Sequence, residues 1–172
     1  SVTPTHLLYQ LDAYLREHDG DVVAVNDEQR LVALDRTCFY PGGGGQPADV
    51  GRLVDPQTGR EWVVAGAEKD GSVVWHRLAG DDELPAVGTT VRAALDWDHR
   101  YQLMRTHTAL HVLCGVVFRD YGCLVTGGNM GIDRARMDFE MDSADFTPER
   151  VATIARRANQ EIALGREVRV RI

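Results

Sequence analysis

Short apolar runs separated by turn residues fill the chain between residues 21 and 95. The runs are DVVAVND, RLVALD, GRLVD, EWVVAGAE, SVVWHRL and TTVRAALD, and pairs such as Asp-Gly, Gly-Gly and Asp-Pro stand between them. Runs of this length, rich in β-branched residues and bounded by turn residues, are typical of strands. Their spacing predicts a small β-barrel or sandwich.

A helical pattern replaces the apolar runs after residue 96. Residues 98–122 predict a long helix, with Asp98 as its N-cap and Gly122 as its stop. A shorter helix is also expected near the N-terminus, over residues 6–19.

The last third of the chain predicts strand, helix and strand. Residues 128–142 alternate apolar and polar positions, as a strand does. Residues 147–165 predict a helix, because Thr147 is a good cap and Pro148 suits the first helical position. Residues 166–172 are again strand-like.

Together these elements predict an α+β protein of two domains. A β-barrel domain is expected over residues 1–95, and an α+β domain over residues 96–172. The last expected strand stops at Ile172 with no cap, turn or tail. We therefore expect the second domain to be truncated at its C-terminus.

Composition narrows the class of protein. The chain has 172 residues, of which 44% are hydrophobic and 26% charged, as in an ordinary globular protein. No apolar stretch is long enough to span a membrane, and the N-terminus does not resemble a secretion signal. Three cysteines give no disulfide framework, so we expect a cytoplasmic protein. The formal charge of −7 argues against DNA binding or broad coating of nucleic acid.

Two histidines one helical turn apart are the first candidates for chemistry. Residues four apart share a helix face, so His107 and His111 lie on one predicted stripe. The stripe is Leu103, His107, His111, Cys114 and Phe118, and we expect it to face the interior or a pocket. The pair could be core histidines or metal ligands, because a shared metal would offset the cost of burying both.

The spacing resembles a zinc-protease signature, but that motif needs Glu directly after the first histidine. Thr108 stands there, which disfavours a protease. Zinc prefers four ligands, commonly His and Cys. Cys114 is on the same stripe and Cys123 lies past the helix end, so the sequence alone does not complete a coordination shell.

A run of glycines is the second candidate, within LDRTCFYPGGGGQPADVG (34–51). It could be a simple turn between strands, or a place where the backbone approaches a ligand closely and exposes N–H donors. The run lacks the lysine of a P-loop and the spacing of a dinucleotide fingerprint, which excludes a nucleotide-phosphate role.

In combination, four segments resemble one family. LDRTCFYPGGGGQPADVG, VWHRL, LDWDHRYQLMRTHTALHVL and GNMGIDRARMDFE occur in this order. They are similar to the editing domain of alanyl-tRNA synthetase and to its freestanding relatives, the AlaX trans-editing proteins. The resemblance covers roughly residues 3–172, and a freestanding form with the glycine motif is the best match.

The resemblance implies a fold and an activity. The fold is a small β-barrel followed by an α+β domain related to threonyl-tRNA synthetase editing domains. The activity is that of a zinc-dependent aminoacyl-tRNA deacylase, which needs no ATP and hydrolyses seryl-tRNA(Ala), with glycyl-tRNA(Ala) as a second substrate. The partner is the acceptor end of tRNA(Ala); the oligomeric state stays open.

The resemblance also implies site residues. His107 and His111 match two zinc ligands, and a later C-x-x-x-H element supplies the other two in the family. That element is absent here, so the chain has two of four expected ligands, and we expect the others in a tail beyond residue 172. Thr37 matches the position that recognises the seryl side chain, although a strand threonine packed against a neighbour is the plainer interpretation.

Further roles are open at this stage. Gln46 and the amides of Gly43, Gly44 and Gly45 could position the terminal adenosine or polarise the ester carbonyl. Zinc could bind the substrate amine or activate water.

Four arginines could touch phosphate or be ordinary surface charges. They are Arg100, Arg105, Arg156 and Arg157. Two alternatives to the predicted function remain: a non-catalytic tRNA-binding module, and an editor of another mischarged tRNA.

Overall fold

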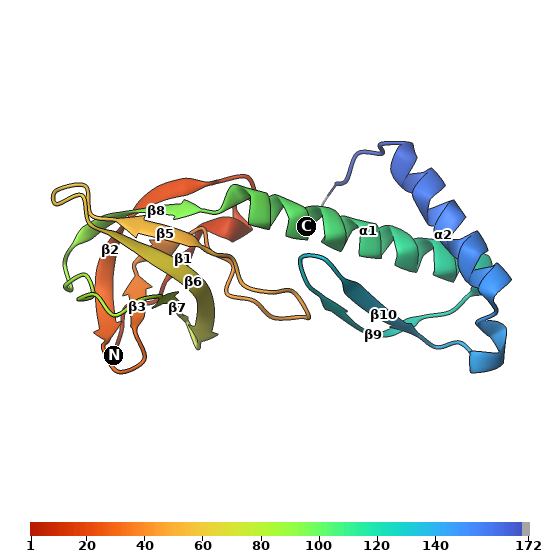
Figure 1. The fold of residues 1–172 in the computed structure, drawn as a ribbon, viewed down its shortest axis with the longest axis horizontal. Coiled ribbons are helices and arrows are strands. Elements are labelled where there is room, and N and C mark those ends of the chain that lie inside the picture. The colour runs from red at the N-terminus through yellow and green to blue at the C-terminus, as the bar shows by residue number, and fades with distance from the viewer. Residues whose placement is uncertain (170–172) are drawn as a thin grey trace. The chain divides into compact units, whose positions relative to one another are not determined.

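The computed structural model describes residues 1–169 (Figure 1). Contacts between Cα atoms divide the chain into two compact units, Ser1–Tyr101 and Gln102–Ile172. The division falls inside helix α1 (Trp97–Tyr121), a few residues after the boundary that the sequence predicts. The first unit contains a barrel, and the second contains a hairpin and helix α2 with most of α1.

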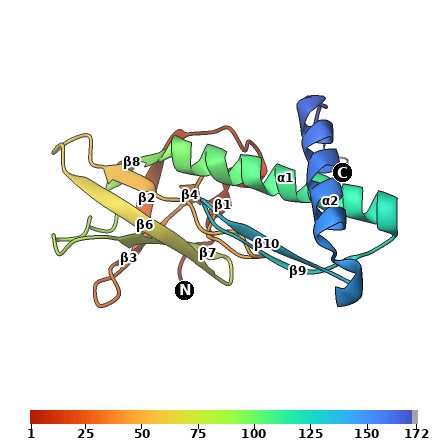
Figure 2. The ribbon, with the colours of Figure 1, turned by 45° about the vertical axis from the view of Figure 1, so that its right-hand side comes forward.

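A closed barrel forms the first unit (Figures 1 and 2). Its strands are joined by antiparallel pairing in the order β2-β3-β7-β6-β5-β8, and β8 pairs back to β2. They are β2 (Glu17–Asn26), β3 (Leu31–Leu34), β5 (Gly51–Val54), β6 (Glu61–Asp70), β7 (Val73–Leu78) and β8 (Thr90–Leu95). Each apolar run of the sequence contributes one strand, so the predicted barrel is confirmed.

Apolar side chains fill the barrel. Burial alternates along β6 and along much of β2 and β8, because successive side chains point to opposite faces of a strand. The inward positions form one buried cluster, which includes Val22, Leu34, Phe39, Leu53 and Val91. The strands that pack on this core form the wall from which the glycine motif extends.

The N-terminal segment is not a helix, and the prediction of one over residues 6–19 is wrong. Strand β1 (His6–Leu7) pairs in parallel with β4 (Arg36–Thr37), and a single 3-10 turn, η1 (Leu8–Gln10), follows it. The buried hydroxyl of Thr5 donates to the carbonyl of Leu34 and accepts from the amide of Val74. Pairing with the barrel therefore overrides the local helical pattern.

Helix α1 confirms the long helix predicted from residue 97, but its cap differs. The side chain of Asp96 accepts from the amide of His99 at 3.2 Å, while Asp98 lies inside the first turn. Asp98 is therefore not the cap; it stabilises the helix start through its charge. Gly122 ends the helix as predicted, with a φ of 69°. None of the helices within residues 1–169 has the length and apolar character needed to cross a membrane.

The second unit continues with a hairpin and helix α2 (Pro148–Ala163). The segment predicted as one strand, residues 128–142, instead spans the end of β9 (Val125–Met130), a turn and β10 (Ala135–Phe139), which pair as an antiparallel hairpin. A short 3-10 turn, η2 (Ser143–Asp145), leads to α2, whose cap is Thr147 as predicted. Residues 166–169 are not a strand, and residues 170–172 of the predicted strand lie outside the described chain.

Gly51 gives a direct test of how the barrel closes. A Cβ built on Gly51 would overlap the carbonyl oxygen of Ala94 on the neighbouring strand β8. Gly51→Ala should therefore lower the free energy of unfolding by about 3 kcal/mol, because the backbones must separate. Chemical denaturation measures this change.

Gly66→Ala is the matched control, since a Cβ on this strand glycine meets nothing within 4 Å. It should leave stability unchanged or raise it slightly, because alanine loses less backbone entropy on folding. Equal effects of the two substitutions would show that β5 and β8 do not approach as described.

Candidate functional site

The glycine run forms an ordered tight turn, which we call the glycine turn (residues 42–46). The amide of Gly43 donates to the carbonyl of Gln46 and the amide of Gln46 donates to that of Gly43, both at 3.0 Å. Gly44 and Gly45, at its tip, have φ values of 61° and 82°. Two positive φ angles between paired residues define a type I′ hairpin turn, for which glycine is well suited.

The turn leaves room at its tip. A Cβ on Gly44 would meet no atom of the protein within 4 Å, and Gly44 and Gly45 are exposed. Asparagine also fits the first position of such a turn. Nothing within the described chain therefore requires glycine at position 44, and a close approach by a ligand backbone is compatible with the geometry.

Tyr40 ties the base of the turn to the barrel. Its hydroxyl donates to the carbonyl of Gly43 at 2.9 Å, and its ring meets Tyr9 edge to face at 5.6 Å. The amide of Tyr40 donates to the carboxylate of Asp49, whose own amide donates to the carbonyl of Tyr40. The segment is thus held from both ends.

A buried ion pair fixes that segment to helix α1. Asp49 and Arg100 are 1% and 4% exposed, and the closest contact, from Arg100 Nη2 to Asp49 Oδ2, is 2.6 Å. The guanidinium also donates to the carbonyls of Ala13 and Cys38, at 2.7 and 2.8 Å. Arg100 is therefore neither a phosphate contact nor a surface charge, because it is buried and each of its three nitrogens donates to a group of the first unit.

Thr37 lies on β4, which pairs with β1 and is not one of the six barrel strands. It has no exposed surface, its hydroxyl lies 2.7 Å from Nε2 of His76, and it accepts from the amide of Phe39 at 3.0 Å. Burial lowers the pKa of His76 to about 4, so this histidine is neutral at physiological pH. The role of Thr37 in recognising a seryl side chain stays a prediction.

A second buried histidine supports the same segment. Nε2 of His18 accepts from the amide of Cys38 at 3.1 Å, which requires that its Nδ1 carry the proton and donate to the carbonyl of Asp19. Burial is the main reason that the pKa of His18 is lowered, and burial raises the pKa of the Cys38 thiol to about 12. Cys38 is thus a neutral core residue.

The histidine pair, His107 and His111, is exposed on α1, so of the two expected positions, the interior or a pocket, the interior is wrong. The Nε2 atoms of the two residues are 3.1 Å apart and their rings stack at 4.9 Å. Phe118 is also exposed, at 58%, whereas Leu103, Val116 and Val117 are buried. The apolar residues of α1 occur on all sides of the helix, so sequence spacing alone did not identify the buried face.

The geometry of the pair fits two positions of a metal site. Two imidazole nitrogens on one tetrahedral zinc ion lie about 3.3 Å apart, from Zn–N distances of about 2.0–2.1 Å. Partial desolvation, together with the neighbouring His111, lowers the pKa of His107, which favours the neutral ring that a metal needs. Among residues 1–169, however, no three His, Cys, Asp or Glu side chains are grouped to hold a metal ion.

The other predicted site residues fall in different units. Thr37, the glycine turn and its Gln46 belong to the first unit, and the histidine pair and Arg105 belong to the second. Arg105 and Arg156 are exposed, which leaves both open to solvent, while Arg157 pairs with Asp120 at 2.7 Å.

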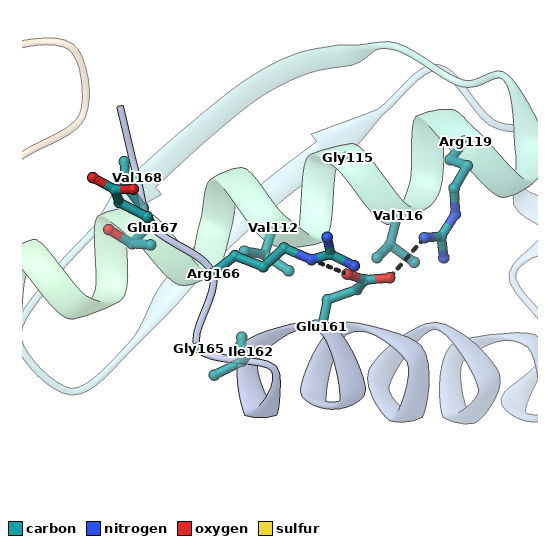
Figure 3. Close-up of a pocket in the computed structure, with 11 residues that line it drawn as sticks. Val112, Gly115, Val116, Arg119, Glu161, Ile162, Gly165, Arg166, Glu167 and Val168 are labelled. Carbon is teal, nitrogen blue, oxygen red and sulfur yellow. Dashed lines mark hydrogen bonds and ion pairs between the residues drawn. The ribbon is translucent and has the colours of Figure 1, made fainter. Parts of the chain in front are cut away.

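A groove of about 360 Å³ lies between α1 and α2 within the second unit (Figure 3). Val112, Val116 and Ile162 provide apolar lining, and Glu161 bridges Arg119 and Arg166 at 2.8 and 3.2 Å. None of the predicted site residues lines it. The pair between Arg119 and Glu161 joins the two helices at the surface, and the groove is separate from the predicted site residues.

Sequence reasoning missed two residues that shape the site, Asp49 and His76, and it took Arg100 for a phosphate contact or a surface charge, whereas Arg100 is the buried partner of Asp49. Asp49 and His76 lie within segments that carry the family resemblance, PADVG and VWHRL. Their presence in those segments was the available signal, but only the structure shows that they are buried and paired.

Comparison with known proteins gives the family. Residues 10–99, more than half of the chain, match the family model of class II (A) tRNA synthetases. AlaX-M of Methanosarcina mazei, an alanyl-tRNA editing protein, is 39% identical over 168 residues, which are 95% of this chain and 66% of that protein. AlaX-M of Methanosarcina acetivorans is 41% identical over 82% of this chain and 59% of its own length. The alanine–tRNA ligase of Pyrococcus furiosus is 38% identical over 96% of this chain but 18% of the ligase.

The chain therefore belongs to the class II (A) tRNA synthetase family. Within that family it belongs with the AlaX-type alanyl-tRNA editing proteins, to which it is similar over most of its length. It spans 66% and 59% of the two AlaX-M relatives.

The ion pair between Asp49 and Arg100 makes a prediction about stability. Asp49→Ala leaves a guanidinium buried without its carboxylate, so the free energy of unfolding should fall by about 3–5 kcal/mol. Denaturant titration of the purified chain measures it.

Arg92→Ala is the control, because Arg92 pairs with Glu17 and Asp19 only at the surface. It should leave the unfolding midpoint nearly unchanged, since exposed ion pairs contribute little. A similar shift for both variants would contradict the special role of the buried pair.

Proposed function

We propose that this chain catalyses the editing reaction of its family, the hydrolysis of the ester that joins serine to mischarged tRNA(Ala). Glycyl-tRNA(Ala) is proposed as a second substrate, and the chain is proposed to act in trans, on tRNA released by the synthetase. Two relatives named alanyl-tRNA editing proteins, each similar over more than four fifths of the chain, support the reaction class.

The observation that carries the proposal is the convergence of the two Nε2 atoms of His107 and His111 on the exposed face of α1. Two imidazole nitrogens at this separation suit a metal ion, and the exposed face leaves a substrate room to approach. Zinc bound there would supply Lewis-acid chemistry for ester hydrolysis. A four-coordinate ion needs two further ligands, which residues 1–169 do not group around this pair.

The first unit would supply binding groups. The exposed amides at the tip of the glycine turn are N–H donors suited to the terminal adenosine or the ester carbonyl, and Gln46 adds a side-chain amide. Thr37 is proposed to recognise the seryl hydroxyl. Arg105, exposed near the histidine pair in sequence, is proposed to contact backbone phosphate. With a net charge of −7, a limited grip on the acceptor end is more plausible than broad tRNA coating.

The central test compares three substrates. The protein is incubated with seryl-, glycyl- and alanyl-tRNA(Ala) carrying labelled amino acids, and release of the label is followed. We expect seryl-tRNA(Ala) to be hydrolysed about 100-fold faster than alanyl-tRNA(Ala), because a placed hydrogen-bonding partner discriminates strongly. His107→Ala and added chelator should each lower the rate about 100-fold.

Thr108→Ala, on the same helix, is the control and should retain the rate. If His107→Ala and the chelator change nothing while seryl-tRNA(Ala) is still hydrolysed, the metal role fails and the editing function stands. Binding of tRNA without any hydrolysis would instead support a non-catalytic module, and hydrolysis of seryl esters on other tRNAs would indicate a different editor.

The tip of the glycine turn gives a second test. Asparagine suits the backbone conformation at position 44. The free energy of unfolding of Gly44→Asn should therefore stay within about 0.5 kcal/mol of that of the starting protein. If substrate approaches the tip, the added side chain obstructs it, and the kcat/KM for seryl-tRNA(Ala) should fall about 10-fold.

Gly71→Asn is the matched control. Gly71 has a φ of 57°, lies in the turn between β6 and β7, and also has open space around its Cβ position. It should change neither stability nor rate. An unchanged rate in Gly44→Asn as well would remove the glycine turn from the substrate site.

A further inference from the structure

The first unit contains a hydrogen-bonded side-chain pair of which the proposed reaction uses only one member, Thr37. Thr37 on β4 and His76 on β7 are both 0% exposed, and the distance from the hydroxyl oxygen to Nε2 is 2.7 Å. Phe39 packs against the His76 ring edge to face, with the ring centroids 5.3 Å apart. Buried polar groups of this kind are held in one geometry by their neighbours.

The surroundings determine where the protons lie. Nδ1 of His76 is 3.0 Å from the carbonyl oxygen of Val32, and a carbonyl can only accept a hydrogen bond. Nδ1 therefore carries the proton, and Nε2 of the neutral ring is left as an acceptor. Since Nε2 cannot donate, the hydroxyl of Thr37 must donate to it.

This leaves the Thr37 oxygen with a single free function. A hydroxyl has one proton and two lone pairs. The proton goes to His76, and one lone pair accepts the amide of Phe39 at 3.0 Å. The remaining lone pair can only accept, so a substrate group that pairs with Thr37 must be a donor.

We propose that His76 is a positioning residue for substrate selection: by accepting the hydroxyl proton of Thr37, it fixes the Thr37 oxygen as a pure acceptor for the hydroxyl of a seryl group. The proposal rests on the function proposed above. A seryl hydroxyl can donate to this lone pair, whereas glycyl and alanyl groups have no side-chain donor. Because Thr37 has no exposed surface, the atoms that cover it must give way as the substrate enters, while His76 keeps the proton turned aside.

A double-mutant cycle tests this coupling. Thr37→Val removes the acceptor, and His76→Phe removes the group that orients it while keeping a ring. Each variant should lower kcat/KM for seryl-tRNA(Ala) about 10- to 100-fold and leave glycyl-tRNA(Ala) within about 3-fold, because glycine never uses the acceptor. The double variant should be no slower on the seryl substrate than the slower single variant.

The glycyl rate separates positioning from general damage. Equal losses on both substrates, or losses that multiply in the double variant, would overturn the proposal. His76→Gln retains an acceptor in its amide oxygen and should recover part of the seryl preference; a preference as low as that of His76→Phe would also count against the inference.

A readout independent of activity completes the test. Nitrogen-15 NMR of the histidine side chains at pH 7 should show His76 as the neutral ring protonated at Nδ1. A ring protonated at Nε2 would overturn the proposed hydrogen-bond direction. If no aminoacyl-tRNA is hydrolysed while this tautomer is found, the proposed function fails and the hydrogen-bond network itself stands.

Discussion

The buried pair between Asp49 and Arg100 is the interaction on which the candidate site of the first unit depends. One guanidinium reaches the carbonyls of Ala13 and Cys38 and the carboxylate of Asp49, and that carboxylate also accepts from the amide of Tyr40. Segments far apart in sequence thus share one charge-assisted network. Because every member is paired, the desolvation cost of the charges is offset, whereas removing one member leaves a buried charge alone. This network fixes the position of the glycine turn, which is anchored through Tyr40.

Local patterns predicted most of the fold. The short apolar runs form the barrel strands, Thr147 caps α2, and Gly122 ends α1. These features could be predicted because each is determined by residues that are close together in the sequence. The expected helix over residues 6–19 failed because its first residues pair with β4 and the amide of His6 donates to the carbonyl of Asp35, contacts that no local pattern contains. The hairpin partner β9 was missed for a similar reason: VTGGNM is rich in glycine and has no clear alternation.

The sequence predicted which residues belong to the candidate site better than it predicted their surroundings. The sequence paired His107 with His111, and the structure brings their nitrogens together. It did not reveal that they are exposed, because apolar residues occur all around α1 and no single face stands out. Arg100 looked like any surface cation, and only the position of Asp49, far away in sequence, makes it a buried one. His76 appeared in a resembling segment without a role, which its contact with Thr37 now suggests.

The pairing of β1 with β4 has a mechanical consequence. The ladder is two residues long, and its second rung joins Leu7 to Thr37 itself. A pull applied through the N-terminus would load the hydrogen bonds of Thr5 and His6 before any barrel strand. These hydrogen bonds, which lie beside the strand that carries Thr37, would therefore break first.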